Sequence, residues 1–239
     1  MGIKLSEGAG AVFFKINGKE GCLVEGSGAT RHKYEPGRAA LEGTLIGLST
    51  KHEVFEGDHS DTVKLVLADL EPGKPNMHVT FTIASGGDDE TEGDASAFGL
   101  RLLGRLNAID VGQPIEIRPW HVEAGGKIGD TVFESAYAGC SVKQGGKPMT
   151  EDYGNGITAL PELPKHKIGN KEVYDKSPWN DLLAAVLQQV AAKIPQRGQQ
   201  QTRAVSEGID VGEAAAAAEA AASAPVPQAA ARESFRARA

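Results

Sequence analysis

Cysteine is scarce in this sequence, and the two present, Cys22 and Cys140, lie far apart and form no C-x-x-C motif. A disulfide framework and a cysteine-based zinc site are therefore excluded as organising features. No apolar stretch is long enough to span a bilayer, and the first residues lack the apolar segment of a secretory signal. We therefore expect a cytoplasmic protein that does not enter a membrane.

Motifs for common enzyme chemistry are also missing. The chain has no G-x-x-x-x-G-K-[ST] loop, no G-x-G-x-x-G after a strand, no G-x-S-x-G elbow and no H-E-x-x-H pair. An acidic stretch over residues 88–94 could attract Mg²⁺ or Ca²⁺, but it lacks the spacing of a calcium loop. We interpret it as a solvated loop and expect no enzymatic activity, metal or cofactor; a metal-dependent nuclease is the weaker alternative.

The chain has little positive charge in excess of negative charge. It carries 25 Lys and Arg against 32 Asp and Glu, a formal net charge of −7. Proteins that coat duplex DNA through bulk charge are usually basic, so this class is disfavoured. A local basic groove remains compatible with the composition.

The order of the predicted elements indicates the fold class. Residues 11–16 and 21–24 are apolar patches separated by the hairpin signal Asn17-Gly18. Residues 41–54, 62–68 and 77–84 read as three antiparallel strands, the last with strict alternation. A helix follows, with Asp94 as the expected N-cap, and then come strands over 115–118 and 131–138.

Few folds place three strands, one helix and two strands within about 100 residues; the five-stranded OB barrel is the leading one. We therefore predict a mainly β protein with four segments. These are an N-terminal β extension (1–40), an OB-fold barrel (41–142), a turn-rich segment with a docking helix (143–194), and a disordered Ala/Gln-rich tail (195–239).

The docking helix is predicted from Ser177 as N-cap and Pro178 at the first helical position. Seven apolar residues form a stripe at helical spacing: Trp179, Leu182, Leu183, Val186, Leu187, Val190 and Ile194. Such a stripe needs a partner surface, either the barrel or another chain, so a homo-oligomer is left open.

A barrel face that binds single strands without sequence preference needs cations for phosphates and aromatic rings on which bases stack. Basic and aromatic residues on or near the predicted strands meet this requirement. The candidate nucleic-acid-binding residues are Arg31, Lys33, Tyr34, Lys51, Phe55, Lys64, Arg118 and Trp120.

Several segments occur in a distinctive order along the chain. They are Phe13-Phe14-Lys15-Ile16, Thr30-Arg31-His32-Lys33-Tyr34-Glu35, Gly43-Thr44-Leu45-Ile46-Gly47, Ser96-Ala97-Phe98, Gln113-Pro114-Ile115-Glu116-Ile117-Arg118-Pro119, and Gly156 with Leu160-Pro161-Glu162-Leu163. Because of these segments and their order, the stretch from Phe13 to Val190 resembles a group of bacteriophage single-stranded DNA-binding proteins with an OB fold.

The resemblance implies a protein that coats and protects single-stranded DNA during replication or recombination, in the host cytoplasm if phage-encoded. Replication or recombination proteins would be further partners. The tail, however, ends in Arg236-Ala237-Arg238-Ala239, without the acidic tip through which many such proteins recruit enzymes. The outward positions of the second and third strands are also poor in aromatics: Lys64, His78, Thr80 and Thr82.

We therefore expect a non-enzymatic single-stranded DNA-binding protein. The alternative is a structural or assembly protein in which the barrel and the last helix make protein contacts.

Overall fold

A computed structural model describes residues 11–26, 30–55, 57–86, 93–169 and 171–194. The chain is mainly β, and ten strands of the described part join one sheet in the order β12-β11-β8-β4-β5-β6-β1-β2-β3, with β7 paired to β6. Their bounds are β1 (Val12–Asn17), β2 (Cys22–Glu25), β3 (His32–Lys33), β4 (Leu41–Phe55), β5 (Asp58–Ala68), β6 (Met77–Ser85), β7 (Asp94–Ala95), β8 (Pro114–Val122), β11 (Tyr137–Gln144) and β12 (Lys147–Pro148).

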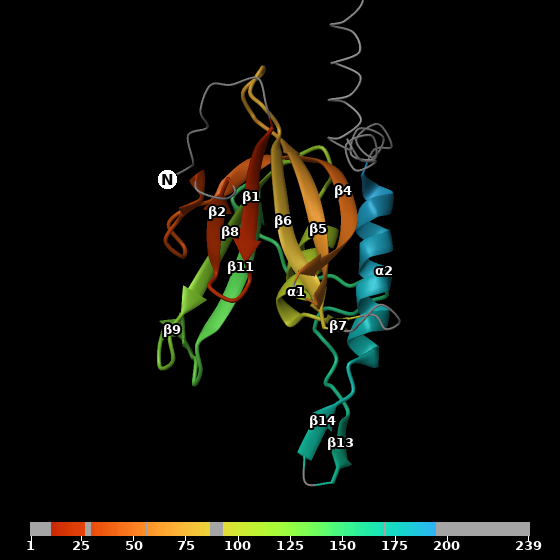
Figure 1. The fold of residues 1–239 in the computed structure, drawn as a ribbon. Helices are drawn as coiled ribbons and strands as arrows, with labels where there is room; N and C mark the ends of the chain where they lie inside the picture. The colour runs from red at the N-terminus through yellow and green to blue at the C-terminus, as the bar shows by residue number, and fades with distance from the viewer. Residues whose placement is uncertain (1–10, 27–29, 56, 87–92, 170, 195–239) are drawn as a thin grey trace, which may run out of the picture. The chain divides into compact units, whose positions relative to one another are not determined.

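Two further pairs of strands form separate hairpins, β9 (Lys127–Ile128) with β10 (Thr131–Val132), and β13 (Lys165–Ile168) with β14 (Lys171–Tyr174). The helices are α1 (Ala97–Asn107) and α2 (Ser177–Lys193). Figure 1 shows β1, β6, β5 and β4 side by side, with α2 running along the β4 side.

The N-terminal hairpin is built into the main sheet. β1 pairs with β2 antiparallel and with β6 in parallel. The β1–β2 turn is fixed by Asn17, whose side-chain oxygen accepts the backbone N–H groups of Lys19 and Glu20. The inward side chains Phe14 and Ile16 are 2% and 1% exposed, so this hairpin contributes to the core.

The sheet curls until its N-terminal side meets β8. The backbone N–H of Gly37, after β3, donates to the carbonyl of Pro119 at 3.0 Å. At Gly21 a Cβ would lie 2.0 Å from the carbonyl oxygen of Trp120, and its φ is +58°. Only glycine fits this approach without strain. The hydrogen-bonded ladders of the described strands nevertheless do not join β6 to β11, because β1 occupies the edge of β6.

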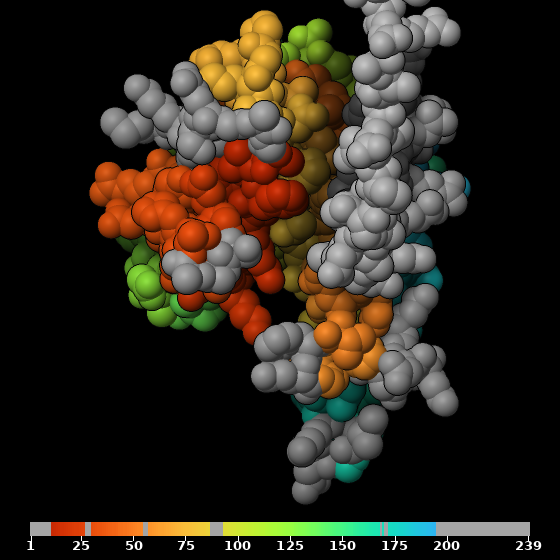
Figure 2. Space-filling model, turned by 45° about the horizontal axis from the view of Figure 1, so that its top comes forward, coloured from red at the N-terminus to blue at the C-terminus, as the bar shows by residue number. Residues whose placement is uncertain are grey.

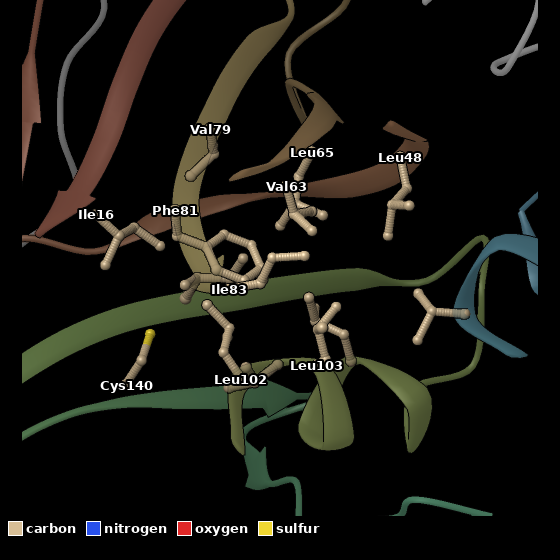
Figure 3. Close-up of a cluster of buried hydrophobic side chains, with 14 of the residues drawn as sticks. Ile16, Leu48, Val63, Leu65, Val79, Phe81, Ile83, Leu102, Leu103 and Cys140 are labelled. Atoms are coloured by element: carbon tan, nitrogen blue, oxygen red, sulfur yellow. The ribbon is translucent and has the colours of Figure 1, made fainter. Parts of the chain in front are cut away.

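The core lies between this curled sheet and α1. Figure 3 shows Phe81 and Ile83 of β6 pointing toward Leu102 and Leu103 of α1, with Val63 and Leu65 of β5 above them. Phe81, Leu102 and Leu103 are fully buried. Alternation on the strands and 3.6-residue periodicity on the helix therefore place their apolar residues in one cluster.

Three sequence predictions differ from the structure in detail. Helix α1 is capped by Ser96, whose hydroxyl accepts the Gly99 N–H at 3.0 Å, whereas Asp94 lies in β7 and forms an ion pair with Lys176. The strand expected over 131–138 is β11, at 137–144. Its buried residues Cys140 and Val142 alternate with more exposed ones, but glycine, cysteine and serine gave this stretch a weak strand signal.

The third difference concerns α2. Ser177 is its first residue rather than its cap, and the Asp175 carboxylate accepts the Ser177 N–H at 2.9 Å. A hydrogen bond with the Ser177 side chain, and then this backbone hydrogen bond, lower the pKa of Asp175 below its ordinary value.

Helix α2 packs on α1 and on the end of the sheet. Val186 and Val190 are 0% and 1% exposed within the common core. Polar contacts fix the orientation of the helix: the Asn107 side-chain amide donates to Gln189 at 2.9 Å, and the Ala95 N–H donates to Asn180 at 2.8 Å.

We predict that Val186→Ala lowers the free energy of unfolding by about 2 kcal/mol. The change removes two buried methyl groups and leaves a cavity in the core. Gln188→Ala, on the exposed face of the same helix, serves as control and should change stability by less than about 0.5 kcal/mol. Denaturant unfolding measures both. Equal stability of the two variants would show that α2 does not pack on the core.

Candidate nucleic-acid interface

Three lysines lie in one line across the outer face of the sheet. Strand pairing aligns Lys64 of β5 with Thr80 of β6, Thr80 with Lys15 of β1, Lys15 with Val24 of β2, and Val24 with Lys33 of β3. Directly paired residues project to the same face. Strands lie about 4.8 Å apart, so successive lysines are separated by about 10 Å. We call Lys64, Lys15 and Lys33 the lysine row.

An aromatic pair lies next to the lysine row. Phe13 and His78 are paired two residues before Lys15 and Thr80 on the same strands. Their ring centroids are 5.0 Å apart in an edge-on arrangement. Phe13 is 54% exposed, so part of its ring is accessible to a ligand. Figure 2 shows the N-terminal residues, in red and orange, on one surface of the molecule.

The charges on this face repel one another. Burial and then the charge of Lys51 lower the pKa of Lys64. Burial and then the charge of Lys64 lower the pKa of His78, whose Nδ1 is buried without a hydrogen-bond partner among the described residues. Lys51, Lys64 and His78 are thus close enough to interact electrostatically, and each positive charge disfavours the next.

Acidic neighbours offset little of this repulsion. Lys33 forms an ion pair with Glu20 at 2.8 Å and Lys51 with Glu53 at 3.3 Å, and all four side chains are substantially exposed. Exposed pairs of this kind contribute little and are easily exchanged for other anions. Within the described part of the chain, Lys15 and Lys64 have no acidic partner.

Of the residues predicted from sequence, Lys33, Lys51 and Lys64 are therefore brought onto one face. Arg31 is exposed immediately before β3. The hydrogen bond from Lys33 lowers the pKa of Glu20, and the charge of Arg31 adds a smaller effect in the same direction. Phe55 is the last residue of β4, and its side chain lies outside the described part of the structure.

The side chain of Tyr34 is fixed by contacts within the protein. Its hydroxyl donates to the Glu25 carboxylate at 2.5 Å, and its ring contacts His32 edge-on at 4.5 Å. Burial and then this hydrogen bond raise the pKa of Tyr34 to about 12. The ring also packs against the core, so its faces are partly occupied by protein.

Arg118 and Trp120 lie elsewhere, on β8. Arg118 forms an ion pair with Glu116 at 3.2 Å. The Trp120 ring lies over Gly139 and contacts Tyr137 and Phe133, with centroids 5.7 Å and 6.4 Å away. No hydrogen bond, ion pair or ring contact among the described residues joins these two side chains to the lysine row, although the Trp120 backbone closely approaches Gly21 of the β1–β2 turn. This aromatic cluster secures the segment between β8 and β11, which contains β9 and β10.

Sequence reasoning missed Phe13, Lys15 and His78. The signal for the first two was the alternation within β1, where Phe14 and Ile16 are buried while Phe13 and Lys15 are exposed. A short apolar patch does not show such alternation clearly. The parallel pairing of β1 with β6 joins residues more than 60 positions apart and has no local sequence signature.

No group of metal-ligating side chains is found among the described residues. The acidic stretch falls largely in residues 87–92, which lie outside them. Neither described helix is long and apolar enough to cross a membrane. A comparison of the chain with protein-family models, curated proteins and solved structures finds no match.

The aromatic cluster on β8 gives a direct test of packing. A Cβ at Gly139 would lie 2.3 Å from Cζ2 of Trp120, so we predict that Gly139→Ala lowers the free energy of unfolding by about 1–3 kcal/mol. In a Trp120→Ala background the same change should have little effect, because the clashing ring is gone. Urea unfolding of the four proteins measures this coupling, and additive effects would contradict the contact.

Proposed function

We propose that the protein binds single-stranded DNA without sequence preference, across the outer face that carries the lysine row. The observation that carries this proposal is the alignment of Lys64, Lys15 and Lys33 across neighbouring strands, beside the exposed ring of Phe13. Lys51 is close enough to Lys64 to lower its pKa further, after burial. Repulsion between like charges on one face lowers the stability of the free protein. A polyanion along the face removes the repulsion and releases its own counterions.

The face also supplies the second requirement for binding single strands. Bases stack on aromatic side chains regardless of sequence, and Phe13 offers an exposed ring on the same strand and face as Lys15. Thr80 and Ser49 continue the same cross-strand line and add hydroxyl groups suited to phosphate or sugar oxygens.

A five-stranded OB barrel is part of the proposal. Its support is the element order β4-β5-β6, α1, β8 and β11, with β8 returning to pair with β4. The second and third strands of an OB barrel are its common binding face, and they correspond to β5 and β6. In this chain β1 extends that face, because it adds to the free edge of β6.

The biological role we propose is protection of single-stranded DNA in replication or recombination, as the resemblance to bacteriophage proteins implies. The mechanism needs only phosphate neutralisation and base stacking, with no chemical step.

The salt dependence of binding tests the lysine row. For the wild-type chain on oligo-dT, log K should fall linearly with log salt. In the triple variant Lys15→Ala, Lys33→Ala, Lys64→Ala the slope should be smaller by about 2, since each phosphate contact contributes about 0.7. Fluorescence anisotropy at several salt concentrations measures both slopes.

Lys147→Ala is the matched control, because Lys147 is exposed on β12 at the other end of the strand order. It should leave the slope unchanged. If the triple variant keeps the wild-type slope while remaining folded, the DNA does not contact this face.

The stacking role of Phe13 has a separate test. Phe13→Ala should weaken binding to oligo-dT by about 1–3 kcal/mol, while Phe13→Tyr, which keeps the ring, should bind nearly as wild type. Val132→Ala controls for loss of an exposed apolar side chain, since Val132 is 53% exposed on β10. Equal affinity of Phe13→Ala and wild type would remove Phe13 from the site.

Binding should also depend on pH through His78. The pKa of His78 lies below its ordinary value of 6.5 in the free protein, and adjacent phosphates would favour the charged ring and raise this pKa. The complex therefore holds more protons than the free protein, and affinity should rise as the pH falls below 6.5. The unliganded protein loses stability over the same range, because its unfolded state binds more protons.

Affinity should therefore be measured at pH values where melting curves show a folded protein. His78→Gln should flatten the pH dependence, whereas His121→Gln, beside Glu123 on β8, should not. An unchanged dependence in His78→Gln would exclude His78 as the titrating group.

A further inference from the structure

The β13–β14 hairpin is an exposed arm. Its two strands pair only with each other, and every side chain of the hairpin that the structure describes is exposed. Figure 1 shows the hairpin below β7, at the opposite end of the molecule from the loop that joins β5 to β6. A two-stranded hairpin alone in water is marginally stable, so its regular pairing without a packed face is notable.

One face of this arm repeats the chemistry of the outer sheet face. Register places Lys165 opposite Tyr174 and Lys167 opposite Glu172, and all four side chains share this face. The Lys165 ammonium lies over the Tyr174 ring, 5.2 Å from its centroid, and Tyr174 is 48% exposed. The Lys165–Glu172 ion pair, at 3.7 Å, is itself exposed and holds Lys165 only weakly.

The arm is also locally basic in an acidic chain. Residues 165–174 contain Lys165, His166, Lys167 and Lys171 against the single acid Glu172. Asp175, just after the arm, lies 4.0 Å from His166, so the excess positive charge of the arm comes from its lysines. These favour an anionic occupant.

The base of the arm is tied to the end of the proposed binding face. Lys176 forms an ion pair with Asp94 at 3.3 Å, and Asp94 pairs with Ser85, the last residue of β6. Ser85 is five residues beyond Thr80 of the cross-strand line, about 17 Å along the strand. The distance from the lysine row to the base of the arm is therefore short enough for one bound strand to span, past Asp94, whose charge Lys176 offsets.

We propose that the arm is a second contact for the same nucleic-acid strand, with Lys165 and Lys167 on phosphates and Tyr174 stacked on a base. This inference rests on the proposed function, because it extends the path of the DNA beyond the outer sheet face. The arm lengthens the stretch of DNA that the protein covers. A short oligonucleotide would contact the sheet face alone, whereas a long one would contact both the sheet face and the arm.

The test compares oligo-dT of about 6 nucleotides, near the short end of the usual site size of about 4–16 for one OB fold, with oligo-dT of about 30, well beyond it. The variant Lys165→Ala, Lys167→Ala should bind the short oligonucleotide like wild type. On the long one, its affinity should fall at least about fivefold and its salt slope should shrink by about 1.4, for two phosphates. Tyr174→Ala should weaken only long-oligonucleotide binding, and Tyr174→Phe should restore it.

Lys127→Ala is the matched control, since Lys127 is an exposed lysine on the other separate hairpin, β9–β10. Melting curves of all variants should match wild type because the altered side chains are exposed. If the double variant binds the long oligonucleotide with wild-type affinity and slope, the arm does not contact DNA and the inference fails alone. A change in oligomeric state with unchanged DNA binding would assign the arm to protein contacts and also overturn it. If wild type binds neither length in a salt-dependent way, the proposed function itself fails.

Discussion

The parallel pairing of β1 with β6 is the constraint on which the rest of the structure depends. It places Phe14 and Ile16 in the core and, by alternation, Phe13 and Lys15 on the outer face. The energetic reason for the pairing is burial of the two inward residues, which is worth about 1.5–3 kcal/mol for each large apolar side chain. Alternation along β1 then places Phe13 and Lys15 on the outer face. Phe13 forms the aromatic pair with His78, and Lys15 is the middle residue of the lysine row.

Burial and charge repulsion disfavour the charged forms of Lys64 and His78 in the free protein. Lys64 is partly desolvated next to Lys51, and His78 is partly desolvated next to Lys64, so the pKa of each is lowered. Such groups are common where a protein holds a ligand of opposite charge. The acidic balance of the remaining chain reduces non-specific attraction elsewhere, so attraction for a polyanion concentrates on the faces that lack acidic partners.

Sequence periodicity was sufficient where interactions are local. The alternation from Met77 to Ala84 predicted β6, and the apolar spacing from Phe98 to Leu106 predicted α1. It was insufficient where distant segments meet. The outward position of Lys64 could be read from β5 alone, but its alignment with Lys15 and Lys33 depends on four strand pairings. The surroundings of Trp120 were equally hidden, because its position on β8 gave no sign that its ring would contact Tyr137 and Phe133.

The most direct measurement is ultraviolet cross-linking of the full chain to oligo-dT, followed by identification of the linked peptide. We expect cross-links to Phe13 on β1, because its exposed ring lies beside the lysine row. Cross-links confined to the Trp120–Phe133–Tyr137 cluster would place the DNA on β8 instead. That result would contradict the claim that the β1–β6 pairing creates the binding face.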